Sequence, residues 1–324
     1  MANCMNRPEM LSLATAREAF RHEALFYANL DEFLAGTGAF VRDGLMSDEP
    51  VLVVLSRPKI DALRSELGAE SERVEFADMG EVGSNPARII PAWRAFVDRH
   101  RRPGRRLRGI GEPISAERSP AELVECQRHE SLLTLAFADT PGFRLLCPYD
   151  TTALDEDVLA EARRSHPFLV TNGVKRDSTE LRDLDEVAAP VAEPLPEPAT
   201  PPESRVFQAG TLAALRDFVS RRAAGAGFTG QMTDDLVLAV DELATNSVLH
   251  GGGGGILRIW PEGDELVCEV GDRGLIGDPL VGRRHPTADQ AGGYGVWLAN
   301  QLCDLVQVRT FASGSAVRLR KRRG

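Results

Sequence analysis

The chain has little lysine, few aromatic residues and no long apolar run. Its 324 residues include only three lysines, Lys59, Lys175 and Lys321. None of them follows a glycine or precedes a serine or threonine, which excludes the phosphate-binding loop of P-loop ATPases. No apolar stretch approaches the roughly 20 residues that cross a bilayer, and the N-terminus lacks the basic-then-apolar order of a signal peptide. We therefore expect a cytoplasmic protein without a membrane segment.

Cysteine is also sparse, and no two cysteines form a CxxC pair. The five residues, Cys4, Cys126, Cys147, Cys268 and Cys303, are scattered, so the sequence indicates neither a disulfide framework nor a zinc site. The net charge of −10 makes the whole molecule repel nucleic acid. The arginine-rich stretch 99–108 has no interleaved aromatic residues, and we interpret it as a solvated helix end and loop. No direct nucleic-acid partner is expected.

Proline gathers in one place, residues 187–204, with acidic residues between the prolines. A segment of this composition forms neither a helix nor a central strand, and it stays solvated. We interpret it as a semi-rigid linker. It divides the chain into an N-terminal domain, residues 1–186, and a C-terminal domain, residues 205–324.

The N-terminal domain alternates between helical and strand patterns. Buried strands are expected at 50–55, 74–76, 107–110 and 143–149, and helices at 18–41, 60–67 and 121–138. The run Val51–Leu55 is wholly apolar, as in a strand that is buried on both faces. This alternation predicts an α/β layered domain with a mostly parallel sheet.

The C-terminal domain reads as helices followed by hairpins. Helices are expected at 211–224, 233–250 and 294–303, and strands at 255–260, 265–271, 305–310 and 315–319. Helices on one side of a mostly antiparallel sheet make an α+β sandwich.

A carboxylate and a carboxamide stand one turn apart on the helix predicted at 233–250. Leu236, Val240, Leu243 and Ser247 form its buried stripe, whereas Glu242 and Asn246 share a neighbouring face, with His250 one turn further on. Such a pair can hold a hard cation and a water together. As an isolated feature, it is more typical of a solvated i,i+4 polar pair.

Two glycine motifs follow. Asp272 ends a strand and is followed by Gly274, so its carboxylate can accept a hydrogen bond from an exocyclic amine while the glycine admits a flat ring. The stretch 292–295 reads Gly-Gly-Tyr-Gly and leads into a helix, where free backbone amides attract phosphate. Taken singly, these motifs are also typical of a plain turn and of a flexible hinge.

In this order and spacing, the three motifs resemble the N, G1 and G2 boxes of the Bergerat-fold (GHKL) ATPases, the superfamily that includes the histidine kinases. The resemblance implies ATP and Mg²⁺ as cofactors, with Asn246 ligating Mg²⁺ and Asp272 reading the adenine amine. It further implies Gly274 beside the ring, Gly293 and Gly295 along the phosphates, and Glu242 as the catalytic residue, either the base or a water-orienting group. Residues 278–286 would form the lid, from which Arg283, Arg284 or His285 would meet the terminal phosphate.

Within that superfamily, residues 205–324 are most similar to the RsbW-like anti-sigma factor serine kinases, on the stretch 246–251 (Asn-Ser-Val-Leu-His-Gly), the compact lid and 302–304. This resemblance implies a bacterial stress-response regulator that binds a sigma factor and phosphorylates a STAS-type anti-anti-sigma protein. It also implies a homodimer. The sequence departs from many relatives where Leu275 and Ile276 follow Gly274 in place of a second glycine.

The N-terminal domain resembles the MEDS sensory domain of DcmR-like regulators, which looks related to RecA-type ATPase domains. The matching pieces are His22 with Tyr27, the stretches 44–45 and 111–113, and 147–150 (Cys-Pro-Tyr-Asp). Without a P-loop, the resemblance implies a sensor with a small-molecule ligand. Its candidate pocket residues are His22, Tyr27, Cys126, His129, Cys147 and Tyr149.

Two alternatives to a serine/threonine kinase remain. The first is a binding module that takes nucleotide without catalysis and sequesters its sigma factor. The second is a histidine kinase, which would need a phosphoacceptor histidine shortly before the ATPase domain. The roughly thirty residues from Ser204 to Thr233 contain none. His129, followed by Glu130, imitates a phosphoacceptor box but lies on the other side of the linker.

Overall fold

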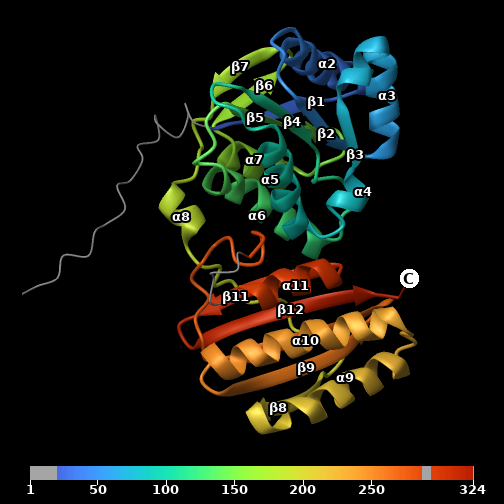
Figure 1. Ribbon diagram of the computed structural model, residues 1–324, viewed down its shortest axis with the longest axis vertical. Helices are drawn as coiled ribbons and strands as arrows, with labels where there is room; N and C mark the ends of the chain where they lie inside the picture. The colour runs from blue at the N-terminus through green and yellow to red at the C-terminus, as the bar shows by residue number, and fades with distance from the viewer. Residues whose placement is uncertain (1–19, 287–292, 324) are drawn as a thin grey trace, which may run out of the picture. The chain divides into compact units, whose positions relative to one another are not determined.

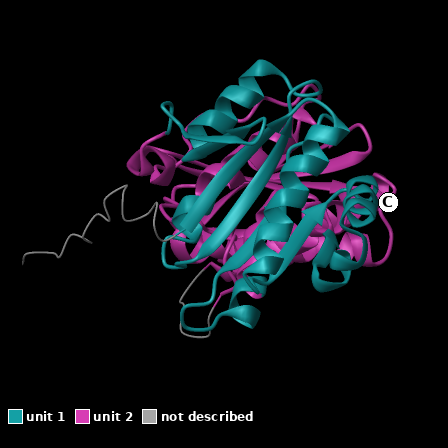
Figure 2. Ribbon diagram, turned by 90° about the horizontal axis from the view of Figure 1, so that it is seen from above, with its two compact units in different colours: residues 1–77, 96–116, 133–181 teal, residues 78–95, 117–132, 182–324 magenta. Residues whose placement is uncertain are grey.

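The computed structural model describes residues 20–286 and 293–323, which form two compact units. Figure 2 colours them: unit 1 holds residues up to 77, 96–116 and 133–181, and unit 2 holds 78–95, 117–132 and 182 onward. The division does not follow chain order, since the helices α5 (Ile89–His100) and α6 (Pro120–Ala136) have residues in both units. Glu18, Cys4 and Gly292, which the sequence analysis named, lie outside the described residues.

Unit 1 is built on a seven-stranded sheet in the order β3-β2-β4-β5-β1-β6-β7, whose strands are labelled in Figure 1. The pairs β2–β4, β4–β5, β5–β1 and β1–β6 are parallel and β6–β7 is antiparallel. The strands are β1 (Phe20–Tyr27), β2 (Val51–Leu55), β3 (Glu75–Asp78), β4 (Leu107–Gly111), β5 (Phe143–Asp150), β6 (Phe168–Thr171) and β7 (Val174–Asp177). The predicted α/β domain with a mostly parallel sheet is confirmed.

The helical elements of unit 1 cover this sheet. They are α2 (Leu30–Met46), α3 (Arg57–Leu67), η1 (Gly68–Arg73) and α7 (Glu156–Ser165), together with the C-terminal ends of α5 and α6. Every residue of β2 is buried, as the wholly apolar run predicted. The core on one side gathers Phe33, Val41 and Leu63 of the helices against Val53 and Ile110 of the sheet.

The helix predicted at 18–41 is wrong in its first part, because residues 20–27 form β1 at the centre of the sheet. The helix begins at Leu30, after Asn29. The Asn29 side chain accepts a hydrogen bond from the Glu32 amide at 2.9 Å, and Glu32 accepts one from the Ala28 amide at 2.8 Å. This reciprocal cap is the physical boundary between strand and helix.

A buried polar triad lies where β1 and β4 end. The Tyr27 hydroxyl donates to Glu112 Oε1 at 2.7 Å, and Lys59 of α3 reaches the same oxygen at 2.6 Å. Burial raises the pKa of Glu112 above its ordinary value, although Lys59 opposes the shift, and burial with the nearby Glu112 charge raises that of Tyr27. Tyr27, predicted for a sensory pocket, is thus held in a closed hydrogen-bonded group.

The triad makes the stability of unit 1 depend on Lys59. We expect Lys59→Met to cost about 3 kcal/mol of unfolding free energy near pH 8, because it leaves Glu112 charged and buried without its cation. The cost should shrink near pH 5. The folded-state pKa of Glu112 is raised, so lowering the pH neutralises this buried carboxyl more readily than an exposed one, and the neutral form needs no cation. Urea unfolding at both pH values measures the difference.

Lys175→Met is the matched control. Lys175 also binds a buried carboxylate, Glu23, at 2.5 Å, but Glu23 keeps a second cation in Arg144 at 3.2 Å. The control should therefore cost less than Lys59→Met at the higher pH. Equal losses for the two variants would contradict the role given to Lys59.

Unit 2 contains the C-terminal sheet, in the order β11-β12-β10-β9-β8, coloured yellow to red in Figure 1. Its four pairings are all antiparallel. The strands are β8 (Glu203–Gln208), β9 (Gly254–Glu262), β10 (Glu265–Asp272), β11 (Leu305–Phe311) and β12 (Gly314–Arg322). The helical elements are α4 (Met79–Val82), η2 (Pro86–Arg88), α8 (Leu184–Ala188), η3 (Ala209–Thr211), α9 (Leu212–Gly225), α10 (Gln231–His250), α11 (Tyr294–Leu302) and the N-terminal parts of α5 and α6.

One face of this sheet packs on helices, which confirms the predicted α+β sandwich. Leu236 and Val240 of α10 meet Leu257, Cys268 and Leu319 of the sheet in a common core. Among the helices of residues 20–286 and 293–323, none has both the length and the apolarity of a bilayer span.

The opposite face of the sheet is lined by charged residues and contacted by the proline-rich segment. Arg258 and Arg318 flank Glu269 on neighbouring strands, and Glu269 accepts hydrogen bonds from both at 2.8 Å. The Thr310 amide donates to the Val191 carbonyl at 2.9 Å, and Arg318 donates to the Pro196 carbonyl at 2.9 Å. Much of the segment interpreted as a linker is exposed, yet these bonds attach it to the sheet.

Candidate functional site

Helix α10 brings Glu242 and Asn246 onto one half-buried face, beside the start of α11. The apolar stripe predicted on this helix is buried: Leu236, Val240, Leu243 and Ser247 are at most 3% exposed. Gly295 packs directly against the Asn246 carboxamide. A Cβ on Gly295 would lie closer to Asn246 Nδ2 than the 3.0 Å that real Cβ atoms keep. The second predicted glycine motif therefore contacts the polar helix motif.

The Asp272 carboxylate is fixed by two hydrogen bonds. The Ser247 hydroxyl donates to Oδ2 at 2.5 Å, and the Gly274 amide donates to Oδ1 at 2.7 Å. Gly251 lies against the same carboxylate, where an added Cβ would sit 2.7 Å from both oxygens. Ser247, predicted only as part of the buried stripe, thus connects α10 to the strand end that carries Asp272. Sequence reasoning missed this bond.

These residues surround a cavity of about 160 Å³ between α10, α11 and the sheet. Among the predicted positions, Asn246, Asp272, Gly274 and Gly293 line it. The remaining walls are mainly apolar, and they include Val270, Ile276, Val281, Val296 and Val317. An apolar slot with one fixed carboxylate suits a flat heteroaromatic ring that carries an amine. Glu242 and Gly295 lie beside Asn246 rather than in the lining.

The N-terminus of α11 lies at this cavity, because its N-cap residue Gly293 lines it. Gly293 is the N-cap and adopts a left-handed conformation with φ 87°, and the helix starts at Tyr294. Four amides at a helix start lack intrahelical partners and favour an anion. The arrangement of Asn246, the cavity and the helix N-terminus fits a nucleotide with its metal ion. The Asn246 carboxamide oxygen is a hard ligand for Mg²⁺, and the backbone amides at the start of α11 suit phosphate.

The three lid candidates have different surroundings. Arg283 is 6% exposed and does not line the 160 Å³ cavity. Arg284 and His285 are exposed, and the His285 ring packs edge-on against Trp297 of α11 at 4.9 Å between centroids. The structure therefore separates Arg283 from the other two, which lie on the solvent side of the lid segment.

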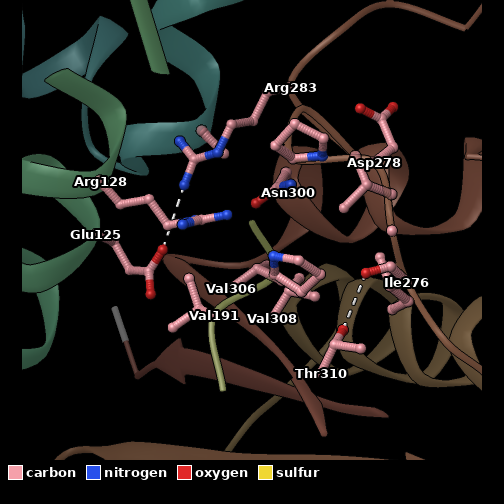
Figure 3. Close-up of a pocket in the computed structure, with 15 residues that line it drawn as sticks. Glu125, Arg128, Val191, Ile276, Asp278, Arg283, Asn300, Val306, Val308 and Thr310 are labelled. Carbon is pink, nitrogen blue, oxygen red and sulfur yellow. Dashed lines mark hydrogen bonds and ion pairs between the residues drawn. The ribbon is translucent and has the colours of Figure 1, made fainter. Parts of the chain in front are cut away.

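Figure 3 shows where Arg283 goes. Its Nη2 donates to Glu125 Oε2 at 3.2 Å, and Arg309 of β11 donates to Glu125 Oε1 at 3.0 Å. Glu125 and Arg283 line a second, smaller cavity together with Arg128, which lies one turn further along α6. Burial together with the Arg283 charge lowers the pKa of Arg128 to about 10. The cavity of about 30 Å³ has room for roughly one water molecule. Arg283 is therefore engaged by α6 rather than exposed to the larger cavity.

The other end of α11 is capped by residues from the segment 78–95. The Arg88 guanidinium donates to the carbonyls of Asn300 and Gln301, each at 2.7 Å, and the Asn85 carboxamide donates to the Cys303 carbonyl at 3.2 Å. The last carbonyls of a helix lack intrahelical partners and carry partial negative charge, so a cation there stabilises it. Sequence analysis assigned no role to Asn85, Arg88 or Glu125.

The predicted sensory residues divide between the two units. In unit 1, His22, Cys147 and Tyr149 are buried near one another, and His22 Nε2 lies 3.3 Å from Cys147 Sγ. Cys126 and His129, on the part of α6 that belongs to unit 2, are buried as well. Burial raises the pKa of the Cys126 thiol to about 12. A further residue that the sequence did not suggest, His166, stacks on His22 at 3.8 Å between centroids.

Two family models match the chain. The model of the methanogen/methylotroph DcmR sensory domain, MEDS, matches residues 21–167, and that of the histidine kinase-like ATPase domain matches residues 207–321. No curated protein matches the chain.

Two solved structures are similar to part of it. The RsbU and RsbW domains of Rv1364c from Mycobacterium tuberculosis are 21% identical over 38% of this chain and 32% of that chain, with a TM-score of 0.30. The histidine kinase AdeS from Acinetobacter baumannii is 11% identical over 37% of this chain and 67% of that chain, with a TM-score of 0.21. This chain thus matches about a third of the first structure's length.

The C-terminal sandwich, with helices on one face of an antiparallel sheet, is consistent with a GHKL-type ATPase domain. Residues 21–167 thus match the MEDS sensory domain and residues 207–321 the histidine kinase-like ATPase domain, as the two resemblances in the sequence indicated. This class of domain implies ATP binding, typically together with Mg²⁺.

Gly295→Ala should weaken binding of ATP with Mg²⁺ by at least about 10-fold, because the new methyl group displaces the Asn246 carboxamide. Calorimetric titration of the full chain measures the affinity. Gly277→Ala is the matched control: its backbone is not left-handed and its Cβ would meet nothing within 4 Å. Unchanged affinity in a folded Gly295→Ala variant would refute the placement of Asn246.

Proposed function

We propose that this chain is an ATP-dependent serine/threonine protein kinase that acts as an anti-sigma factor. It binds a sigma factor, and it phosphorylates a STAS-type anti-anti-sigma protein, under the control of its MEDS domain. The observation that carries the proposal is the convergence of Asn246, Asp272 and the N-terminus of α11 around one cavity. The same contacts support an intact nucleotide site.

Each site residue has a task in this proposal. Asp272, oriented by Ser247 and Gly274, accepts the hydrogen bond of the adenine amine, and Asn246 holds Mg²⁺. Gly293 and Gly295 leave room for the phosphates at the helix start. When bound, ATP supplies the phosphoryl group. Glu242 lies one turn before Asn246 and takes the proton from the partner's hydroxyl group as the hydroxyl oxygen attacks the terminal phosphate of ATP. Arg284 is the lid cation that faces solvent.

Burial argues against His129 as a phosphoacceptor. Its side chain is 1% exposed on α6, so a second protein domain has no access to the ring in this structure. The residues between the proline-rich segment and α10 form β8, η3 and α9 and contain no histidine. These observations favour an external hydroxyl group over an internal histidine as the acceptor.

Two variants separate binding from catalysis. Glu242→Gln should keep ATP affinity within about 2-fold and lower phosphotransfer by at least about 100-fold, because it removes the base alone. Asp272→Asn should weaken ATP binding itself, since an amide at this position presents a donor to the adenine amine. Calorimetry and radiolabel transfer to a STAS-domain protein measure the two effects.

A parent protein that binds ATP but transfers no phosphate would replace the kinase proposal with the alternative of a nucleotide-binding sequestration module. Equal transfer rates for the parent and Glu242→Gln would show that Glu242 is not the base. Both outcomes leave the nucleotide site itself in place.

Control by the sensory domain has a direct structural route in this proposal. Glu125 lies in the stretch that the MEDS model matches, and its carboxylate holds Arg283 of the lid segment. Arg88, in the same stretch, caps α11, whose other end lies at the nucleotide cavity. We propose that these contacts restrain the lid, and that a ligand of the MEDS domain changes them.

Glu125→Gln tests this route. With the carboxylate neutralised, Arg283, Arg309 and Arg128 repel one another, so the lid segment should loosen and nucleotide should dissociate at least about 5-fold faster. Stopped-flow release of a fluorescent ATP analogue measures the rate, and hydrogen exchange of residues 278–286 measures the loosening.

Glu122→Gln is the matched control on the same helix. Glu122 also binds an arginine of the ATPase domain, Arg322, at 2.8 Å, and its other oxygen accepts from the Ser119 amide at 2.9 Å rather than from the lid segment. Although buried, Glu122 has a lowered pKa because Ser119 and Arg322 donate hydrogen bonds to it, so the control also removes a charge. Equal rates in both variants would contradict a specific restraint by Glu125.

A further inference from the structure

Unit 1 contains three side chains of types that can bind a metal ion, and they are far apart in the sequence. His22 lies on β1, Cys147 on β5 and His166 directly before β6. Since β5, β1 and β6 are neighbours in the sheet, the fold brings these residues together at its centre. Their nitrogen and sulfur ligand atoms all lie within 4.8 Å of one another.

The geometry points to a bound d-block metal ion at this place, and we propose that His22, Cys147 and His166 are its ligands. An ion such as Zn²⁺ binds imidazole nitrogen at about 2.0–2.1 Å and thiolate at about 2.3 Å, which puts neighbouring ligand atoms of a tetrahedral site about 3.5 Å apart. His22 Nε2 and Cys147 Sγ are 3.3 Å apart. Two of the ligands therefore already stand near the separation that such an ion needs.

The orientation of His166 fits a ligand. Its Nδ1 lies 2.8 Å from the Ala162 carbonyl oxygen, which only accepts, so Nδ1 carries the proton and Nε2 carries the lone pair. Metal-bound histidines commonly donate their second ring N–H to a backbone carbonyl in this way, which fixes both the tautomer and the ring direction. The Ser165 hydroxyl, 3.0 Å from the same Nδ1, adds to this support.

The surroundings select the type of ion. His22 and His166 are 0% exposed and Cys147 is 2% exposed, and Phe20 stacks on His22 at 5.8 Å between centroids. Two buried imidazoles and one buried thiolate suit Zn²⁺, Co²⁺ or copper rather than Mg²⁺ or Ca²⁺, which prefer oxygen ligands alone. Binding converts the Cys147 thiol into a thiolate and releases its proton to solvent.

The test is a titration of the chelator-stripped full chain with Co²⁺. We expect about one ion per chain and a near-ultraviolet charge-transfer band from sulfur to cobalt, which Zn²⁺ then displaces. Absence of the band in the folded parent overturns the proposal without any variant. Zn²⁺ should also raise the melting temperature of the parent, because the ion binds the folded state alone.

Two variants locate the ion. Cys147→Ser should abolish the charge-transfer band. His166→Gln should lower the affinity for Co²⁺ by at least about 100-fold, because losing a residue that only hydrogen-bonds to a ligand already costs about 10- to 100-fold. Cys268→Ser, a buried thiol of the C-terminal core, and His100→Gln, a histidine of unit 1 outside the cluster, are the controls. Bands that persist in Cys147→Ser, or that vanish in Cys268→Ser, refute the site. ATP binding is measured in parallel and should be the same with and without the ion, which keeps this test separate from that of the kinase.

Discussion

The nucleotide site depends on the position of helix α11, which is held at both ends. At its start, Gly295 contacts the Asn246 carboxamide so closely that no side chain fits between them. At its end, Arg88 and Asn85 bind the carbonyls of its last turn. A nine-residue helix is too short to be stable by itself, so these contacts rather than intrinsic propensity set its position. Arg88 and Asn85, which lie in the MEDS-matched stretch, therefore help to position the backbone amides at the start of α11 that suit phosphate.

The Arg283–Glu125–Arg309 group has a different energetic character. Burial lowers the pKa of Arg283, and one carboxylate balances two guanidiniums that donate to it, with Arg128 close by. Buried charge pairs contribute little net stability, because desolvation offsets attraction, but breaking one is costly. Such a group fixes the position of Arg283 more than it adds to the folding energy. In the function proposed above, this group restrains the segment 278–286.

The sequence predicted both folds and both family resemblances, because these rest on local pattern. Apolar runs reveal the strands, and the spacing of Glu242, Asn246, Asp272 and the glycines survives in one chain without an alignment. Prediction from the sequence failed where tertiary contacts determine the secondary structure. Residues 20–27 have a helical pattern, but they form β1 at the centre of the sheet, and the helix begins only after the Asn29 cap. Likewise, three lid residues were equivalent in sequence, and only Glu125, about 160 positions away, distinguishes Arg283. The chemical roles of the site residues stay predictions.

Scattered cysteines are weak evidence against a metal site in an α/β domain. The spacing rules for zinc ligands describe ligands that come from one loop or hairpin, where neighbours in sequence are neighbours in space. In a parallel sheet, adjacent strands are separated by whole crossover helices, so ligands on neighbouring strands are necessarily far apart in sequence. His22 and Cys147 are 125 positions apart and still only 3.3 Å apart. Since β1 lies between β5 and β6, the strand order rather than the cysteine count decides whether such a site exists.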